Sequence, residues 1–581
     1  MKRQIICISI ILLSLQSTAK KDNNDVGSST TDVIGDCPAF AVKFSNLKSV
    51  VFDKPDRQEN GKYYFERDSL NAVIQDLGDD KWQLDISNKA SDIEELWFPW
   101  ISKRIKLNDN LQDDIVYYPY LFGTAAKNTF FKDWGWRGLD YPGALFAPIV
   151  ILADGTDGVY AASINWPPIR VRPVYSKDRI AIRYPDKISK GGAFSCSILF
   201  SEIKADRANG KLPWQIAVGK YKIWLEQKME AEQLYPINYS RWMLEIDGFL
   251  NIQLQNFKSF NISEVYQRWN KWSIYFPWVQ FWGQMSDYGG GCCLDETTMH
   301  QRYVPELVQF AKNITTLESG PGHIGYYSRP HYLGYFYENS EGEKSENLNH
   351  ILQWLSKNKE EYYANAFYID ILGHRYFGYP LLVARLFKSD FPQDTCIEYP
   401  VDIYPTAFTI SGSLAGWGKG KNWGKSFEDL EKGCDTIAFP RLGRYLLNDR
   451  IIFLGESGGD YNYWGHKNDY WCERQVFLLG AKFDVMHPQE NFGSITKENT
   501  VLMQIISERR RVSWWKRNPK YLDTTGIKNI PPWVEVRKFR DVDGRTLFAV
   551  ENWALLEGLT FTYEGSQISI PRKQIQIIER E

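Results

Sequence analysis

FYIDILGH, at residues 367–374, and TCIEYP, at residues 395–400, are two apolar runs that each carry an acidic residue near their end. The acids are Asp370 and Glu398, and a glycine-containing loop follows the first of them. In a closed barrel of parallel strands, the side chains at the carboxyl ends of the strands build the active site. If both runs are strands of one barrel, Asp370 and Glu398 should therefore meet at its mouth.

The surrounding sequence supports parallel strands, because short apolar runs alternate with helical stretches over roughly 280 residues, a length that suits a (β/α)8 barrel. The predicted strands are 242–249, 278–284, 323–328, 366–372, 395–398, 437–440, 451–454 and 481–486. The predicted helices between them include 263–272, 304–315, 348–363 and 381–387. This alternation predicts a TIM barrel over residues 236–525.

The regions on either side of the predicted barrel have a different sequence pattern, in which short β-rich runs are separated by turns. This pattern is typical of all-β domains. It predicts an N-terminal β-sandwich over residues 37–235 and a small C-terminal β-domain over 526–581. The predicted fold class is thus a multidomain chain, α/β in the centre and all-β at the flanks.

The first residues are typical of a targeting signal. Lys2 and Arg3 precede an apolar run over 5–15, and the small residues STA follow at 17–19. We therefore expect residues 1–19 to be a signal peptide and the polar residues 20–36 to be a flexible leader. The expected location of the mature chain is secreted or periplasmic. No later stretch reaches 18 consecutive apolar residues, so no membrane span is expected.

Composition narrows the function classes. The 581 residues carry 69 Lys and Arg against 71 Asp and Glu, a formal charge of −2. A nucleic-acid-binding protein needs an excess of cations to displace counterions, so this balance argues against one. Aromatic residues make up 15 % of the chain. Because aromatic rings stack on the C–H faces of sugars, the count favours a carbohydrate partner, although a large aromatic core gives the same number.

Metal and cofactor signatures are weak. The sequence has no C-x-x-C pair, so a zinc ribbon is not expected, and it has no H-E-x-x-H motif. Asp287, Asp295 and Glu296 surround a run of three glycines and could hold Ca²⁺, but a solvated loop is the simpler interpretation. Seven cysteines remain once Cys7 is removed with the signal, and we expect most to be buried thiols.

Two carboxylates at neighbouring strand ends suit a retaining glycosidase. One attacks the anomeric carbon, and the other protonates the leaving oxygen and then activates water. We assign Asp370 as the nucleophile and Glu398 as the acid/base. Asp402, four residues on, competes for the second role, with a turn acid as its structural alternative. Glu456, after the predicted strand 451–454, could bind sugar hydroxyls or be the acid/base.

Aromatic and polar residues near other predicted strand ends are candidates for substrate binding. Each could instead be an ordinary packing residue of a loop or of the core. The candidates are Trp282, Tyr327, His374, Arg375, Tyr463 and Trp464.

GESGG, at residues 455–459, fits the G-x-S-x-G pattern of an esterase nucleophile, with Ser457 as the serine. Such a serine needs a helix directly after it, but the following residues are rich in Tyr, Asn, Asp and Gly. The acid and histidine that should follow at a distance, Asp484 and His487, are only three residues apart. A serine esterase is therefore the weaker alternative.

The runs around Asp370 and Glu398 resemble the nucleophile and acid/base strands of the endo-α-N-acetylgalactosaminidases, and of related uncharacterised bacterial glycosidase-like proteins. WG at 282–283 and HIGYYS at 323–328 are similar to the same group, and the resemblance spans about residues 240–500. It implies a β-sandwich, a (β/α)8 barrel and a C-terminal β-domain. It also implies a retaining mechanism at an α-glycoside, with Asp370 and Glu398 in the roles given above.

This chain is shorter than the typical mucin-acting enzymes and lacks their accessory modules, so the O-glycan substrate is not carried over. The sequence thus predicts an exported glycoside hydrolase acting on a glycan or polysaccharide, without a cofactor. A non-catalytic carbohydrate-binding protein is the main alternative.

Overall fold

The computed structural model describes most of the chain. The described residues are 28–29, 37–254 with short breaks (47, 68, 90, 102–103, 109, 111–112, 132–136, 238–239), 262–283, 305–317, 322–328, 352–369 without 354 and 357, 380–398, 401–409, 423–424, 427–448, 450–455, 471–488 and 500–580.

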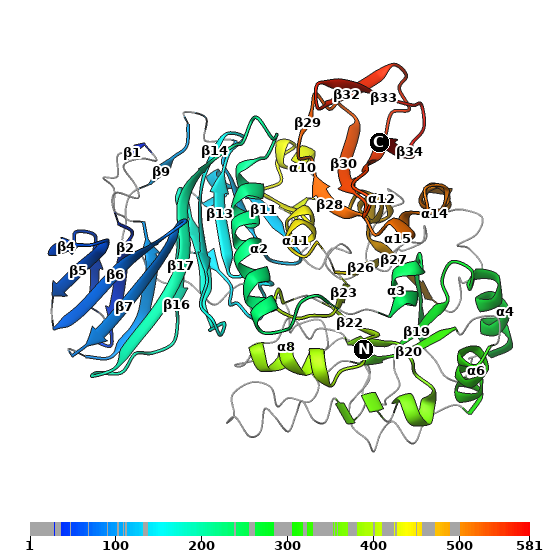
Figure 1. Cartoon of the computed structure of the whole chain (residues 1–581), viewed down its shortest axis with the longest axis horizontal. Helices are drawn as coiled ribbons and strands as arrows, with labels where there is room; N and C mark the ends of the chain where they lie inside the picture. The colour runs from blue at the N-terminus through cyan, green and yellow to red at the C-terminus, as the bar shows by residue number, and fades with distance from the viewer. Residues whose placement is uncertain are drawn as a thin grey trace.

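The N-terminal part consists of two mainly antiparallel sheets that pack face to face, with β13 and β14 of one contacting β15 and β16 of the other (Figure 1). Eleven strands form one sheet, in the order β24-β25-β11-β10-β13-β14-β17-β7-β6-β5-β4, and six form the other, β12-β15-β16-β8-β2-β3. Their bounds are β2 Ala39–Phe44, β3 Ser49–Phe52, β4 Arg57–Glu59, β5 Lys62–Arg67, β6 Leu70–Gly78, β7 Lys81–Asn88, β8 Ile93–Trp100, β10 Ile115–Tyr118, β11 Thr124–Lys127, β12 Arg137–Gly138, β13 Ile149–Ala153, β14 Asp157–Ser163, β15 Arg172–Ser176, β16 Arg179–Tyr184, β17 Ala193–Lys204, β24 Trp423–Gly424 and β25 Thr436–Ala438. A short pair, β1 Ser28–Ser29 and β9 Ile105–Lys106, and a 3-10 turn, Asn128–Phe131, complete this part.

Strand β6 shows why these segments form half-buried strands. Leu70, Ala72 and Ile74 are buried, and the residues between them are more exposed. Alternation with a period of two places one set of side chains on the core face. The same pattern recurs along β5 and β7, so the sheet buries a continuous apolar face.

Helix α2, Pro213–Ala231, joins the N-terminal sheets to the rest of the chain (Figure 1). It begins with proline, whose fixed φ suits the first helical position, and the side chain of Gln215 accepts a 2.8 Å hydrogen bond from the backbone N–H of Leu212. The helix packs on β13, β14 and β17 and also contacts α11. Its buried Trp214, Tyr221 and Trp224 bridge the two parts.

Eight parallel strands close into a barrel, in the order β18-β19-β20-β21-β22-β23-β26-β27. The last strand pairs with the first, so the sheet has no edge. The strand bounds are β18 Gly248–Leu254, β19 Trp278–Gly283, β20 His323–Ser328, β21 Phe367–Ile369, β22 Thr395–Glu398, β23 Ala407–Thr409, β26 Ile452–Gly455 and β27 Lys482–Pro488. Among the described residues, the helices of this part include α3 Arg241–Glu245, α4 Ile262–Trp272, α6 Pro305–Thr315, α8 Pro380–Ser389, α10 Phe427–Glu431, α11 Arg441–Leu446, α12 Trp471–Leu478, α14 Thr500–Arg511 and α15 Trp514–Arg517. The predicted TIM barrel is confirmed.

Two of the predicted barrel strands are wrong. Residues 242–249 were expected to form one strand, but 241–245 are the helix α3 and the strand begins only at Gly248. The run at 437–440 is not in the barrel, because β25 pairs antiparallel with β11 of the N-terminal sheet. The barrel strand in that interval is β23, which has only three residues and therefore too few for a recognisable pattern. An apolar run does not reveal which sheet it joins.

The C-terminal part contains two small sheets, β28-β30-β31-β34 and β29-β32-β33. Their bounds are β28 Lys520–Asp523, β29 Ile527–Lys528, β30 Val534–Arg540, β31 Thr546–Asn552, β32 Leu559–Tyr563, β33 Ser566–Ile570 and β34 Ile575–Arg580. Buried Asp523 ties this part to the others, because it accepts hydrogen bonds from Arg441 of α11 and from Gln215 of α2. This ion pair and this amide hydrogen bond hold β28 against α11 and α2.

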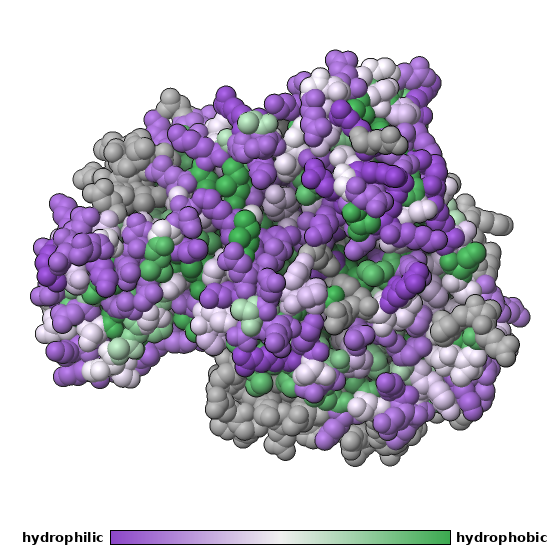
Figure 2. Space-filling model, in the orientation of Figure 1, coloured by the Kyte–Doolittle hydropathy of each residue, from purple (hydrophilic) through white to green (hydrophobic). Residues whose placement is uncertain are grey.

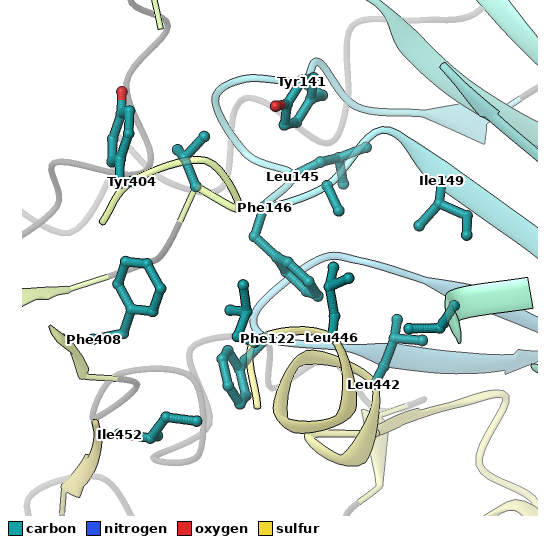
Figure 3. Packing of buried hydrophobic residues seen from close by; sticks show 14 of the residues in the cluster. Phe122, Tyr141, Leu145, Phe146, Ile149, Tyr404, Phe408, Leu442, Leu446 and Ile452 are labelled. Atoms are coloured by element: carbon teal, nitrogen blue, oxygen red, sulfur yellow. The ribbon is translucent and has the colours of Figure 1, made fainter. Parts of the chain in front are cut away.

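One large apolar cluster runs from the N-terminal sheets through the barrel. Figure 3 shows a part of it in which Tyr141 and Phe146 lie near Tyr404 and Phe408 of the barrel and Leu442 of α11. In the orientation of Figure 2, hydrophilic residues cover most of the surface and hydrophobic ones are scattered between them. Within the part of the chain that the structure describes, no helix is both long and apolar enough to cross a membrane.

Candidate active site

Aromatic rings that meet across the barrel show which side chains point into it. Phe249 of β18 lies 5.2 Å from Phe453 of β26 and 6.1 Å from Tyr368 of β21, measured between ring centroids. Trp278 of β19 lies 5.6 Å from Phe453. None of these contacts joins hydrogen-bonded neighbours, so the rings meet inside the barrel. These four residues fix the inward face of their strands.

Alternation and register extend this assignment to Glu398. Tyr368 pairs with Cys396 across β21 and β22, and paired residues on adjacent strands share a face. Glu398 is two residues beyond Cys396 and therefore also faces inward. It pairs with Thr409, which in turn pairs with inward-facing Phe453, so two independent routes agree. Glu398 is the last residue of β22 and is 7 % exposed. This is the strand-end position that barrel active sites use.

Asp370 lies outside the described residues, but the residue before it is described. Ile369 ends β21 and pairs with Ile397 of β22. Asp370 and Glu398 are thus the next residues in sequence after a hydrogen-bonded pair. The two acids that the sequence singled out follow matched positions of adjacent parallel strands.

Most of the other predicted site residues also lie outside the described part of the chain. They are Glu456, Ser457, His374, Arg375, Tyr463 and Trp464, with Asp287, Asp295 and Glu296 of the suggested Ca²⁺ loop. Trp282 lies within β19 and Tyr327 within β20, each near the carboxyl end of its strand. Only their backbone is described, so their roles stay predictions.

Beneath Glu398 the barrel contains a polar level that was not predicted. A level here is the set of residues at one height along the barrel axis. Because barrel strands are tilted, residues at the same height are displaced by about one position from the hydrogen-bonded partners at each step to the next strand. Following the registers from Phe249 around the barrel brings Gln280, Tyr368, Thr409 and Asp484 to one level. All four face inward and are almost fully buried. Barrel interiors are usually filled by branched apolar side chains, so polar residues here are unusual.

Gln280 and Asp484 are the clearest members of this level, and both are 0 % exposed. The negative charge of Asp484 reaches Cys396, because it adds to burial in raising the pKa of that thiol well above its ordinary value. The signal in the sequence was a polar residue flanked by apolar ones within a strand, Gln280 in WVQFWG and Asp484 in KFDVMHP. Such a residue is ambiguous until the closed sheet shows which face is inside.

Asp402 has a different environment from Glu398. It is fully buried, and both carboxylate oxygens accept hydrogen bonds, at 2.7 Å from the hydroxyl of Tyr141 and at 2.5 Å from that of Tyr221. The backbone N–H of Asp402 donates to the carbonyl of Phe146, and the guanidinium of Arg450 donates to the backbone carbonyl of Asp402. Burial raises the pKa of Asp402 to about 6, and the two tyrosine hydrogen bonds oppose a larger rise. The carboxylate thus holds the N-terminal part and α2 against the barrel.

Ionisable groups elsewhere in the described barrel do not form a metal centre. Among the described residues, no three His, Cys, Asp or Glu side chains are arranged to hold a metal ion. The single described histidine of the barrel floor, His323, stacks on Trp242 with ring centroids 3.4 Å apart. Burial lowers its pKa to about 4, so its imidazole is neutral at physiological pH.

Comparison with known proteins gives structural neighbours only. No family model matches the chain, and no curated protein matches it. Among solved structures it is similar to a GH31 α-xylosidase from a soil metagenome, with 9 % identity, a TM-score of 0.47, and coverage of 90 % of this chain and 98 % of that one. It is also similar to a xylosidase from Aspergillus niger, with 10 % identity, a TM-score of 0.41, and coverage of 94 % and 84 %. A GH31 dextranase from Flavobacterium johnsoniae has 10 % identity, a TM-score of 0.42, and coverage of 90 % and 72 %. These neighbours are glycoside hydrolases.

Proposed function

We propose that the protein is an exported retaining glycoside hydrolase that cleaves α-linked sugars of a glycan or polysaccharide. Asp370 is the nucleophile and Glu398 is the acid/base. One observation carries the proposal. Ile369 of β21 pairs with Ile397 of β22, and the next residue along each chain segment is an acid, Asp370 after the first and the inward-facing Glu398 after the second.

Each acid has a defined part in the reaction. Asp370 attacks the anomeric carbon, and the bond from that carbon to the leaving oxygen breaks while Glu398 donates its proton to that oxygen. A covalent glycosyl–enzyme ester results. Glu398, now a carboxylate, then takes a proton from water, whose oxygen attacks the same carbon and releases Asp370. Two inversions leave the anomeric configuration unchanged.

Glu398 suits the acid/base role better than Asp402. A general acid must be able to reach the leaving oxygen of the substrate. Both oxygens of Asp402 already accept hydrogen bonds from buried tyrosines that belong to the N-terminal part and to α2. Glu398 instead ends a strand and faces the inside of the barrel. We therefore assign a structural role to Asp402.

The test combines substitutions with the stereochemistry of the product. Purified protein is screened against α-linked aryl glycosides and natural polysaccharides. Asp370→Asn and Glu398→Gln are each expected to lower kcat by at least about 10³-fold, since each removes a group that acts in the reaction. Proton NMR of the first product is expected to show the α-anomer. An aryl glycoside with a good leaving group needs no proton, so Glu398→Gln should retain much more of its first step there.

Ile397→Val is the matched control, because Ile397 lies beside Glu398 but faces away from the barrel interior. It should leave kcat unchanged. Equal turnover by the wild type and both acid variants would refute the assignment. Binding of sugars without any hydrolysis would indicate a non-catalytic carbohydrate-binding protein. Loss of activity in Ser457→Ala with full activity in Asp370→Asn would indicate the esterase.

A further inference from the structure

Two tryptophans lie exposed at one end of the C-terminal sheet β28-β30-β31-β34. Trp533 directly precedes β30 and Trp553 directly follows β31, and they are 61 % and 39 % exposed. The two strands pair Val534 with Asn552, and the N–H of Trp553 donates a 3.0 Å hydrogen bond to the carbonyl of Trp533. The tryptophans are therefore neighbours across the end of the ladder. Neighbouring exposed apolar side chains mark binding surfaces, whereas single ones need no explanation.

Trp533 occupies a backbone position that suits glycine. The N–H of Val534 donates to the carbonyl of Pro531 at 3.3 Å, which closes a tight turn. Trp533 is the third residue of this turn, with a φ of +66°, where Gly or Asn is the usual choice. A bulky residue in this conformation is strained, and most of the Trp533 surface is exposed, so core packing offsets little of the strain. The indole therefore needs an explanation other than folding stability.

Trp553 is held in place by buried polar groups. The guanidinium of buried Arg474 lies over its indole ring. The side chain of buried Asn552 accepts a 3.3 Å hydrogen bond from the N–H of Leu556 and donates a 2.9 Å bond to the carbonyl of the same residue. These bonds close the loop that carries Trp553. A ring that is fixed before binding loses little conformational entropy when a ligand packs on it.

The size of this surface limits what can cover it. Full burial of a large aromatic side chain removes about 150–250 Å² from water, and the exposed parts of the two indoles together offer about that area. Leu555 and Leu556, both exposed, follow in the loop of Trp553 and enlarge the surface modestly. A stable protein interface takes roughly 800 Å² from each partner. The surface is therefore too small for such an interface and suits a ligand that presents one or two rings.

The charges beside the tryptophans are paired. Arg572 donates a 2.8 Å hydrogen bond to Glu557, which lies in the loop of Trp553, and both side chains are largely exposed. Arg474 lies 3.3 Å from Glu551. An anionic polymer or an anionic membrane would require unpaired cations here. Aromatic rings beside a neutral donor–acceptor pair instead fit an uncharged ligand with C–H faces and hydroxyl groups.

We propose that Trp533 and Trp553 form a second sugar-binding site, outside the barrel, that holds an uncharged polysaccharide on the C-terminal sheet. Sugar rings stack on the exposed indoles, and Arg572 and Glu557 supply a donor and an acceptor for hydroxyl groups. The choice of a polysaccharide as the ligand rests on the proposed function, but the binding itself requires no hydrolysis. A second site keeps the chain near the protein and so raises its effective concentration at the barrel.

Affinity electrophoresis of the full chain tests the proposal, with dextran, amylopectin or xyloglucan in the gel. The Asp370→Asn protein is the parent, so that the polysaccharide is not consumed. We expect at least one polysaccharide to retard it, and we expect Trp533→Gly and Trp553→Ala each to weaken that binding at least about fivefold, a common cost of removing a central aromatic contact. Val542→Ala is the matched control, because Val542 is also exposed and lies in the turn after β30. It should bind like the parent.

The melting temperature separates binding from structure. Glycine relieves the strain at a positive φ, so Trp533→Gly should keep or raise the melting temperature while it loses affinity. A lower melting temperature together with weaker binding would show that Trp533 is structural and would refute the proposal. So would an absence of retardation by all of these polysaccharides, or unchanged affinity in both tryptophan variants. Dimerisation in analytical ultracentrifugation, or binding to phosphatidylcholine vesicles, that Trp533→Gly abolishes would assign the surface to a different partner.

This proposal and the proposed function fail separately. In a chain with an intact Asp370, Trp533→Gly should hydrolyse a small aryl α-glycoside with unchanged kcat and a dilute polysaccharide more slowly. If the wild type hydrolyses no glycoside but a polysaccharide is retained through both tryptophans, only the proposed function is refuted. If the wild type hydrolyses glycosides and the tryptophan variants bind polysaccharide like their parent, only the second site is refuted.

Discussion

The hydrogen bonds to Asp402 should stabilise the protein in a pH-dependent manner. Burial raises the pKa of this carboxyl from 3.8 to about 6, a difference equivalent to about 3 kcal/mol. A group whose pKa is raised on folding contributes stability at low pH, and that contribution is lost as the pH rises through the folded pKa. Between about pH 4 and pH 6, Asp402 is ionised in the unfolded chain but largely protonated in the folded protein, so the free energy of unfolding falls as the pH rises. Above pH 6 the carboxylate is charged and depends on its hydrogen bonds.

Tyr221→Phe removes one of these bonds, the 2.5 Å contact from the tyrosine hydroxyl to Oδ2 of Asp402. A hydrogen bond to a charged group contributes about 1.5–3 kcal/mol, against about 1 kcal/mol for a neutral pair. At pH 7.5, where Asp402 is charged, we expect the variant to lose about 2 kcal/mol. At pH 4.5, where Asp402 is protonated, we expect a loss of about 1 kcal/mol or less.

Urea unfolding followed by tryptophan fluorescence measures both values. Tyr404→Phe is the control, because the buried hydroxyl of Tyr404 has no hydrogen-bond partner in the described part of the chain. Its removal should not lower the free energy of unfolding at either pH. A loss for Tyr221→Phe that is equal at the two pH values, or larger at pH 4.5, would refute the assignment of a charged, hydrogen-bonded Asp402.

Three further predictions concern other parts of the molecule. Arg441→Met leaves the fully buried carboxylate of Asp523 without its main cation, so the free energy of unfolding should fall by about 3–5 kcal/mol in a urea titration. A loss below about 1 kcal/mol would contradict this. Native protein treated with iodoacetamide at pH 8 should be labelled at half-buried Cys434 and not at buried Cys396, whose thiol has a strongly raised pKa, as read by peptide mass spectrometry; labelling of both at equal rates would contradict it. Gly123→Ala should lower the melting temperature by several degrees, because φ is +132° and the new Cβ would lie 2.1 Å from a backbone oxygen; an unchanged melting temperature would show that the loop can move at little cost.

The strands of the barrel illustrate how far a sequence pattern can be interpreted. HIGYYS at 323–328 and TCIE at 395–398 were predicted with the bounds that the structure has, since each is a compact apolar run with clear ends. Residues 407–409 were missed, because three residues carry no period. The run at 437–440 was assigned to the barrel but joins the N-terminal sheet, because hydrophobicity reports burial and not the identity of the partner strand.

The candidate site also has some features that the sequence could predict and others that it could not. Local sequence was enough to place Glu398 at the end of β22, because a strand end and an acid are local features, whereas Asp370 directly follows the last described residue of β21 and its position stays a prediction. The different environments of Glu398 and Asp402 could not be predicted from their spacing of four residues. Asp402 bonds to Tyr141 and Tyr221, which are 261 and 181 residues away along the chain. Such partners are brought together only by folding.

The sequence by itself therefore determined the class of the central domain and the positions of most of its strands, since both follow from short-range periodicity, and it placed Glu398 at the end of one of them. Closure of the sheet into a barrel determined the surroundings of these residues. It fixed which face of each strand points inward, and so it placed Gln280 and Asp484 beneath Glu398 and left Asp402 outside among tyrosines. The physical reason is that a strand offers two equivalent faces, and only the pairing of all eight strands determines which face lies inside.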